Sequence, residues 1–265
     1  MNDNTQRFSN RVDNYVKYRP SYPTEIISFL EDKIGFNKNF VVADIGSGTG
    51  ILSEIFLKNG NTVFGVEPNA PMRNKAEELL KEYSVFKSID GTAEQTTLEN
   101  KSVDLITAAQ AFHWFDAEKT KQEFKRILKQ NGYCCLIWNE RLNNSDFLKA
   151  YEQLLKGYST DYTKVDHKNI DDKKIEAFFS PNIVVKKSFS NKQVFDFEGL
   201  KGRLLSSSYT PDENHPNYHT MIESLMNIYS SFNQNNQVQF NYETKVYLGK
   251  LSFCSSHLNL NAFKV

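Results

Sequence analysis

The sequence predicts an α/β fold in which a mostly parallel sheet carries helices on both faces. One observation is the apolar run over residues 40–43, which is typical of a buried parallel strand and is followed directly by Asp44. Another is the glycine-rich turn 46–50, which runs into an amphipathic segment over 51–58. A strand, a glycine turn and a helix in this order bring backbone N–H groups and a helix N-terminus close to a nucleotide-like ligand.

The spacing of the glycines indicates the chemistry of that ligand. A dinucleotide-binding turn reads G-x-G-x-x-G and directs a helix N-terminus at a pyrophosphate. This turn reads G-x-G-x-G, and Asp44 stands two positions before Gly46. A carboxylate at that point would repel a pyrophosphate but could accept a hydrogen bond from an ammonium group. We therefore expect a ligand with a nucleoside end and an amino-acid end; a tight turn without any ligand is the alternative.

Composition excludes several classes of function. The 265 residues predict one large domain, or a domain with an inserted lid, and 32 basic residues balance 32 acidic ones, so nothing indicates a nucleic-acid partner. The chain lacks an apolar run of about 18 residues. We expect no membrane partner, no signal peptide and a cytoplasmic location. Three cysteines without a C-x-x-C pattern predict neither a disulfide framework nor a metal site.

The elements before residue 145 follow a regular alternation. Pro23 and Thr24 open a helix that Gly35 ends. Strands are predicted over 62–66, 85–90, 103–108 and 133–138, with helices after Pro68-Asn69 and over 118–128. Glu67 ends the strand 62–66, 17 residues past Gly50, where an acid hydrogen-bonds the ribose diol in such folds.

Beyond residue 144 the pattern weakens. We predict helices over 147–158, 199–208 and 218–232, and strands over 183–189 and 238–248. The domain organisation we expect is an N-terminal cap arm over 1–23 and a cofactor-binding core over 24–142. Residues 143–265 then complete the sheet and contribute a substrate lid.

At four places in order the sequence resembles the class I S-adenosylmethionine-dependent methyltransferases, in particular the small-molecule subgroup similar to trans-aconitate methyltransferase. The motifs are D-x-G-x-G-x-G over 44–50, Y-x-x-Y-R-P-x-Y-P over 15–23, A-Q-A-F-H-W-F-D over 109–116 and W-N-x-R over 138–141. The resemblance covers about residues 8–250. It implies a Rossmann-like, doubly wound sheet of seven strands with the last one reversed.

The resemblance also implies the ligand residues. S-adenosylmethionine is the expected cofactor and S-adenosylhomocysteine the product. The family pattern G-D-A-E is here Gly91-Thr92-Ala93-Glu94, so Thr92 replaces the carboxylate that usually meets adenine. The residues expected at the cofactor are Tyr18, Arg19, Asp44, Gly46, Ser47, Gly48, Thr49, Gly50, Glu67, Pro68, Met72, Thr92, Ala93, Glu94, Gln110 and Ala111.

The acceptor is expected to be a small molecule, and we hypothesise that it bears a carboxylate. Tyr15, Arg141, Arg203 and Tyr209 are the predicted substrate residues, and an arginine can hold a carboxylate through two parallel hydrogen bonds. His113 and Trp114 are the candidate catalytic residues, with His113 as the base if the nucleophile is a hydroxyl or an amine. A monomer or a homodimer is expected.

Two other functions stay open at this point. One is a non-catalytic protein that binds S-adenosylmethionine or S-adenosylhomocysteine, because binding and transfer share the same residues. The other is an NAD-dependent oxidoreductase, which the G-x-G-x-G spacing and Asp44 disfavour.

Overall fold

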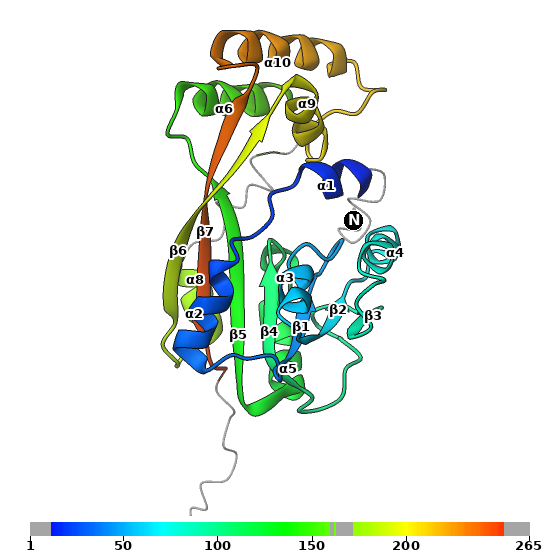
Figure 1. The fold of residues 1–265 in the computed structure, drawn as a ribbon, viewed down its shortest axis with the longest axis vertical. Coiled ribbons are helices and arrows are strands. Elements are labelled where there is room, and N and C mark those ends of the chain that lie inside the picture. The colour runs from blue at the N-terminus through cyan, green and yellow to red at the C-terminus, as the bar shows by residue number, and fades with distance from the viewer. Residues whose placement is uncertain (1–11, 160–161, 163–171, 252–265) are drawn as a thin grey trace, which may run out of the picture.

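A seven-stranded sheet in the order β3-β2-β1-β4-β5-β7-β6 forms the centre of the computed structural model, which describes residues 12–159, 162 and 172–251 (Figure 1). The first five strands pair in parallel, whereas β7 runs antiparallel to both β5 and β6. The predicted strand count and the reversed last strand are therefore confirmed. The strands are β1 Val41–Ile45, β2 Thr62–Val66, β3 Phe86–Ile89, β4 Val103–Ala109, β5 Leu128–Arg141, β6 Val185–Phe195 and β7 Val238–Gly249.

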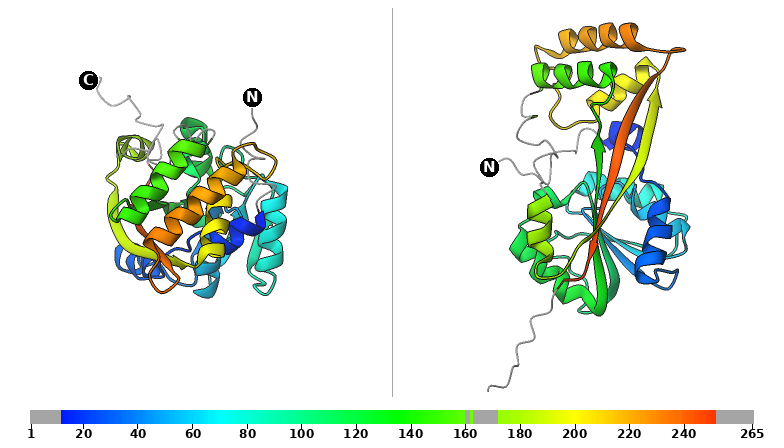
Figure 2. Two further views of the ribbon diagram at one scale, coloured as in Figure 1. Left: turned by 90° about the horizontal axis from the view of Figure 1, so that it is seen from above. Right: turned by 90° about the vertical axis from the view of Figure 1, so that its left-hand side faces the viewer.

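Some of the helices lie on the two faces of this sheet and others form a separate group beyond its strand ends, as Figure 2 shows from the side. The helices are α1 Val12–Tyr18, α2 Glu25–Ile34, α3 Ser53–Lys58, α4 Ala70–Leu79, α5 Ala117–Ile127, α6 Asp146–Tyr158, α8 Asp172–Phe179, α9 Phe197–Leu205 and α10 Tyr218–Phe232, with a short 3-10 helix, η2, at Phe112–Trp114. The apolar residues of α2 and α3 cover one face, and those of α5 and α8 cover the other.

Successive residues of the central strands point to opposite faces, which explains their uninterrupted apolar sequences. Val42 packs with the α2 and α3 cluster, whereas Ala43 packs with the α5 and α8 cluster. The adjacent cysteines of β5 follow the same rule, with Cys134 on one face and Cys135 on the other, both free and buried. Their thiols therefore serve packing on separate sides of the sheet.

A helical cap stands over the carboxyl ends of the parallel strands. The strands β5, β6 and β7 are longer than the others and continue past the sheet to α6, α9 and α10 (Figure 1). The cap has its own apolar cluster, which includes Leu148 of α6, Leu204 of α9 and Leu225 of α10. Helix α1 lies between this cap and the sheet and packs on α9, where the ring of Tyr18 occupies the space that a side chain at position 202 would need.

The structure differs from the predicted elements mainly outside the core. Helix α8 was not predicted, and β5 and β6 extend beyond the predicted segments 133–138 and 183–189. The extra residues of β6 alternate between exposed and half-buried positions and carry few apolar side chains, so hydrophobic patterning does not mark them. The arm before residue 12 and the segment after residue 251 lie outside the described residues.

Candidate active site

Two adjoining cavities lie at the carboxyl ends of β1 and β4, where the strand order reverses and ligands bind in open α/β sheets. The first, which we call the glycine-turn cavity, has a volume of about 170 Å³. Its walls are Tyr15, Gly46, Gly48, Glu67, Pro68, Asn69, Met72, Thr92, Ala93, Glu94, Ala109, Gln110, Ala111, Trp114 and Phe115.

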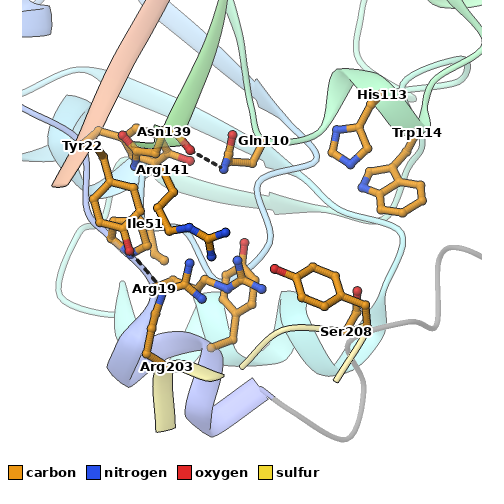
Figure 3. A pocket seen from close by; sticks show the side chains of 14 residues that line it. Arg19, Tyr22, Ile51, Gln110, His113, Trp114, Asn139, Arg141, Arg203 and Ser208 are labelled. Carbon is orange, nitrogen blue, oxygen red and sulfur yellow. Dashed lines mark hydrogen bonds between the residues drawn. The ribbon is translucent and has the colours of Figure 1, made fainter. Parts of the chain in front are cut away.

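The second, which we call the arginine cavity, has a volume of about 90 Å³ and lies under the cap (Figure 3). Its walls are Tyr15, Arg19, Pro20, Tyr22, Ile51, Gln110, His113, Trp114, Asn139, Arg141, Arg203, Ser208, Tyr209 and Tyr242. Both predicted catalytic residues and all four predicted substrate residues line it. Only Tyr15, Gln110 and Trp114 belong to the walls of both cavities.

The three glycines of the turn have different structural roles, although all have left-handed backbones. Their φ angles are +69° at Gly46, +58° at Gly48 and +83° at Gly50. A Cβ at Gly46 would lie 2.7 Å from the Cβ of Ala111, and one at Gly50 would meet Leu80 at 2.5 Å, so both allow close packing. A Cβ at Gly48 would have only the end of Met72 nearby, at 3.4 Å, and Gly48 lines the cavity. Gly48 is therefore the position where the backbone itself forms the wall.

Asp44 is buried near the end of β1. Its side chain is only 2% exposed, and it lines neither cavity. Its two carboxylate oxygens accept hydrogen bonds from Ser53 Oγ at 2.7 Å and Thr107 Oγ1 at 3.0 Å. The carboxylate thus ties β1 to β4 and to the start of α3, and its direct contact with an ammonium group stays a prediction.

Burial raises the pKa of Asp44 from 3.8 to about 6, against the lowering effect of its hydroxyl donors. Between about pH 4 and pH 6 the folded protein holds a proton that the unfolded chain has released, so the free energy of unfolding falls as the pH rises through this window.

We expect Asp44→Asn to raise the free energy of unfolding at pH 7.5, by about 1–3 kcal/mol. Urea unfolding at pH 7.5 and pH 4 checks this, because the advantage should shrink at pH 4; an equal difference at both values would contradict it.

Glu67 lies at the end of β2 and faces the glycine turn. Its carboxylate accepts hydrogen bonds from the backbone N–H groups of Gly48 at 2.8 Å and Asn69 at 2.9 Å. Burial raises the pKa of Glu67, while these two N–H donors and Arg73 oppose the change. Since a carboxylate offers about four lone-pair positions, two of them stay available to a hydroxyl-bearing ligand.

The loops after β3 and β4 form the opposite wall. Thr92 Oγ1 accepts a hydrogen bond from Gln95 N–H at 3.2 Å, which leaves the hydroxyl proton of Thr92 to donate elsewhere. Glu94 Oε1 accepts from Asp116 N–H at 2.9 Å and so joins the two loops. Ala93 and Ala111 line the cavity from these two loops, and Pro68 and Met72 line it from the segment after β2.

Three guanidinium groups meet in the arginine cavity, as Figure 3 shows. Arg19 Nη2 donates to Ser206 O at 2.9 Å, Arg203 Nε donates to Tyr242 Oη at 3.2 Å, and Arg141 is paired with Glu152. Burial and the nearby charge of Arg203 lower the pKa of Arg19. Among the described residues that line the cavity none carries a carboxylate, so positive charge is in excess there.

Each of these arginines keeps one terminal nitrogen without a hydrogen bond to a described residue. Arg203 Nη1 donates to Ser207 Oγ at 3.3 Å, and Arg141 Nη2 donates to Tyr162 Oη at 3.1 Å. Within the part of the chain that the structure describes, Arg19 Nη1, Arg141 Nη1 and Arg203 Nη2 form no further bond. Three such donors in one small cavity suit an anionic group.

Six residues predicted at the cofactor do not line the glycine-turn cavity. Tyr18 packs against Gly202 and Phe195 in the cap, and Arg19 lines the arginine cavity instead. Thr49 and Gly50 line an open groove beside α2 and α3. Asp44 and Ser47 line neither cavity, and Ser47 N–H donates to Val66 O at 3.1 Å. Packing against neighbouring elements, which a motif does not encode, decides each of these positions.

The structure adds wall residues that we did not predict. Asn69 caps α4 by accepting from Met72 N–H at 3.0 Å, and an Asn before a helix-start proline is a readable capping signal. Phe115 belongs to the A-Q-A-F-H-W-F-D motif, but the sequence did not show which of its aromatic rings faces a cavity. Tyr22, Asn139 and Tyr242 join the arginine cavity from three separate elements, so only the fold brings them together.

No group of three or more histidine, cysteine, aspartate or glutamate side chains within the described ranges is arranged to hold a metal ion. In the same part of the chain no helix has the length and apolar character needed to cross a membrane.

Comparison with known proteins places this site in a family. A methyltransferase-domain family model matches residues 43–136, which contain the glycine turn, Glu67 and the loop after β4. An uncharacterised methyltransferase of Schizosaccharomyces pombe is 28% identical over 91% of this chain and 95% of its own length. A proposed methyltransferase of Dictyostelium discoideum is 30% identical over 70% of this chain and 67% of its own length.

Solved structures agree on the fold. A proposed type II methyltransferase from Anaeromyxobacter dehalogenans superposes with a TM-score of 0.66, covering 88% of this chain and 98% of its own, at 16% identity. With the seven-stranded sheet, the glycine turn and the acid at the end of β2, these matches establish the family. The chain belongs to the class I S-adenosylmethionine-dependent methyltransferases, and it is an enzyme of that class.

Proposed function

We propose that this enzyme transfers a methyl group from S-adenosylmethionine, held in the glycine-turn cavity, to a small carboxylate-bearing acceptor held in the arginine cavity. The observation that carries this proposal is the opposite charge of the two adjoining cavities. The carboxylates of Glu67 and Glu94 line the first cavity. The guanidinium groups of Arg19, Arg141 and Arg203 line the second cavity. A positively charged methyl donor therefore matches the first cavity, and a negatively charged acceptor matches the second.

The glycine-turn cavity fits S-adenosylmethionine better than a dinucleotide. The described residues of its wall include no lysine or arginine to meet a pyrophosphate, and the two carboxylates there favour a ligand with positive charge. Gly48 leaves open the space that a Cβ would occupy, and Glu67 has spare acceptor positions for a ribose diol. Met72, Phe115 and Trp114 supply apolar and aromatic surface for a base and a sulfonium. These features support the cofactor and disfavour the NAD-dependent alternative.

The arginine cavity would hold the acceptor by its charge. Arg141 and Arg203 are buried and Arg19 is half-buried, and each can give a terminal N–H to a carboxylate oxygen. Binding of an anion would also relieve the repulsion between Arg19 and Arg203 that lowers the pKa of Arg19. Tyr209 and Tyr242 border the same space and restrict it to a small molecule.

The chain's part in the reaction is binding, alignment and exclusion of water. When bound, S-adenosylmethionine supplies a methyl group that is already activated on a sulfonium. The cap and α1 cover the two cavities, and the arginines orient the acceptor; orientation of this kind can lower a barrier by roughly 7–11 kcal/mol. A carboxylate nucleophile is already deprotonated at neutral pH and needs no general base. His113 lines the cavity as a wall residue in this scheme.

Two measurements test the proposal. Calorimetry with S-adenosylhomocysteine should show binding to the folded wild-type protein. A panel of small mono- and dicarboxylates, matched with their amides and alcohols, should release S-adenosylhomocysteine from S-adenosylmethionine only with the carboxylates. Absence of binding at millimolar ligand would refute the cofactor assignment, and turnover with the amides alone would refute the anionic acceptor.

Glu67 gives a separate test of how the cofactor lies. We expect Glu67→Ala to weaken binding of S-adenosylhomocysteine by about 1.5–3 kcal/mol, the range for hydrogen bonds to a charged group. The variant also frees Gly48 N–H and loosens the turn, which affects every ligand of the cavity alike. The loss should therefore be smaller for an analogue without the two ribose hydroxyls. Calorimetry on both ligands decides, and equal losses would place the ribose away from Glu67.

A further inference from the structure

The boundary between the two cavities is a structural element in its own right. It is made of Tyr15 from α1, Gln110 directly after β4 and Trp114 from η2. Burial raises the pKa of the Tyr15 hydroxyl, and charges from both cavities also act on it. Arg19 and Arg203 on one side lower this pKa, whereas Glu67 on the other side raises it. Any transfer between the cavities must cross the opening that these three side chains frame.

Gln110 is held in an unusual conformation at this boundary. Its φ of +53° lies in the left-handed region, which is unfavourable for a residue with a side chain. Such a conformation persists where the surroundings over-determine it, and it concentrates at functional positions. Here the backbone N–H of Gln110 donates to Ile137 O at 3.0 Å, and its side-chain Nε2 donates to Asn139 O at 3.3 Å.

These two bonds fix the side chain as well as the backbone. Because a main-chain carbonyl can only accept, the amide nitrogen of Gln110 must face Asn139, and the orientation of the amide is determined. Its Oε1 is buried and has no hydrogen-bond partner among the described residues. Asn139 is itself held, since its Nδ2 donates to Ser21 O at 3.1 Å and its Oδ1 accepts from Thr244 at 2.5 Å. These hydrogen bonds hold the side chain of Gln110 at the boundary, although its backbone is strained and its Oε1 has no hydrogen-bond donor among the described residues.

We propose that Tyr15, Gln110 and Trp114 form a size-selective aperture between donor and acceptor, and that Gln110 is held in its strained conformation to limit the width of that aperture. This inference rests on the proposed function. The aperture admits a methyl group and rejects a larger alkyl group on the sulfonium. Gln110 and Trp114 are then specificity-determining residues for the transferred group.

Binding measurements test the aperture without knowledge of the acceptor. The probes are S-adenosylhomocysteine, S-adenosylmethionine and the analogue with an S-allyl group in place of the methyl. We expect the wild-type protein to bind the S-allyl analogue about tenfold more weakly than S-adenosylmethionine, or worse, because extra carbon atoms in a closely packed space are unfavourable. The variant Gln110→Gly adopts the same φ without strain. It should bind the two sulfonium ligands with affinities within about threefold of each other.

Three further variants complete the design. Trp114→Leu widens the aperture through a side chain instead of the backbone and should also lose the discrimination. Phe115→Leu alters the glycine-turn cavity alone. It should weaken the binding of all three ligands and leave the ratios of their affinities unchanged. Lys101→Gly removes a left-handed residue, with φ of +52°, at an exposed position outside both walls and should change nothing.

The outcomes separate this inference from the proposed function. Unchanged S-allyl discrimination in both Gln110→Gly and Trp114→Leu, with normal binding of S-adenosylhomocysteine, would overturn the aperture alone. An equal loss of affinity for all three ligands in Gln110→Gly would show that Gln110 holds the shared part of the cofactor and does not limit the transferred group, and this would also overturn the aperture. Failure of the wild-type protein to bind S-adenosylhomocysteine would overturn the proposed function and the aperture together.

Discussion

Gly48→Val should abolish binding of S-adenosylmethionine and S-adenosylhomocysteine. The backbone of Gly48 forms the cavity wall, its φ is +58°, and the only heavy atom near a Cβ there is the end of Met72 at 3.4 Å. A branched side chain would therefore extend into the space where we place the ligand. We expect calorimetry to show a loss of about a hundredfold or more in affinity, equivalent to roughly 3 kcal/mol.

Backbone strain has to be separated from this steric effect. Gly35 is a suitable control, because its φ is +66°, a Cβ there would meet nothing within 4 Å, and it ends α2 away from both cavities. Either valine places a branched residue in a left-handed conformation, at about 1–3 kcal/mol of stability. Thermal unfolding should show similar losses for both variants. If Gly35→Val loses ligand affinity as Gly48→Val does, the steric interpretation is wrong.

Removal of the guanidiniums should have the second large effect, on the acceptor and not on the cofactor. We expect Arg203→Met and Arg19→Met each to lower kcat/KM for the most active carboxylate of the panel. The loss should be about 1.5–3 kcal/mol, or roughly 10- to 150-fold, because each removes a charge-assisted hydrogen bond to the acceptor. Affinity for S-adenosylhomocysteine should change by less than about twofold, since neither arginine lines the glycine-turn cavity.

Two comparisons make this result specific. Arg126→Met is the control, because Arg126 pairs with Glu123 on α5 and lines neither cavity. Arg203→Lys keeps the charge but not the planar fork, so it should recover only part of the loss. Arg141 is a poorer test, since its removal leaves Glu152 buried without its partner and should destabilise the fold. Full transfer by both methionine variants would exclude an anionic acceptor at this site.

The local pattern of the sequence was sufficient for the core of the fold. Strand β2 coincides with the predicted segment 62–66, and α10 with 218–232. Those elements bury a continuous or regularly spaced apolar surface, so hydrophobic periodicity marks them directly. The ends of β5 and β6 were not predicted, because they are stabilised by pairing with β7, which lies far away in the chain. The short helix α8 was not predicted either, and it packs with α5 on one face of the sheet.

For the site, the sequence by itself identified several residues that line the glycine-turn cavity. Gly48, Glu67 and Ala111 lie at the ends of predicted strands, and the geometry of a parallel sheet brings those ends to one edge. Only the tertiary structure decided where Asp44, Tyr18 and Arg19 direct their side chains, because hydroxyl partners from β4 and packing against the cap settle these orientations. The arginine cavity is likewise a product of the fold. Its charges come from the residue directly after α1, from β5 and from α9, and nothing in their sequence separation indicates that long-range packing leaves three guanidiniums facing one space.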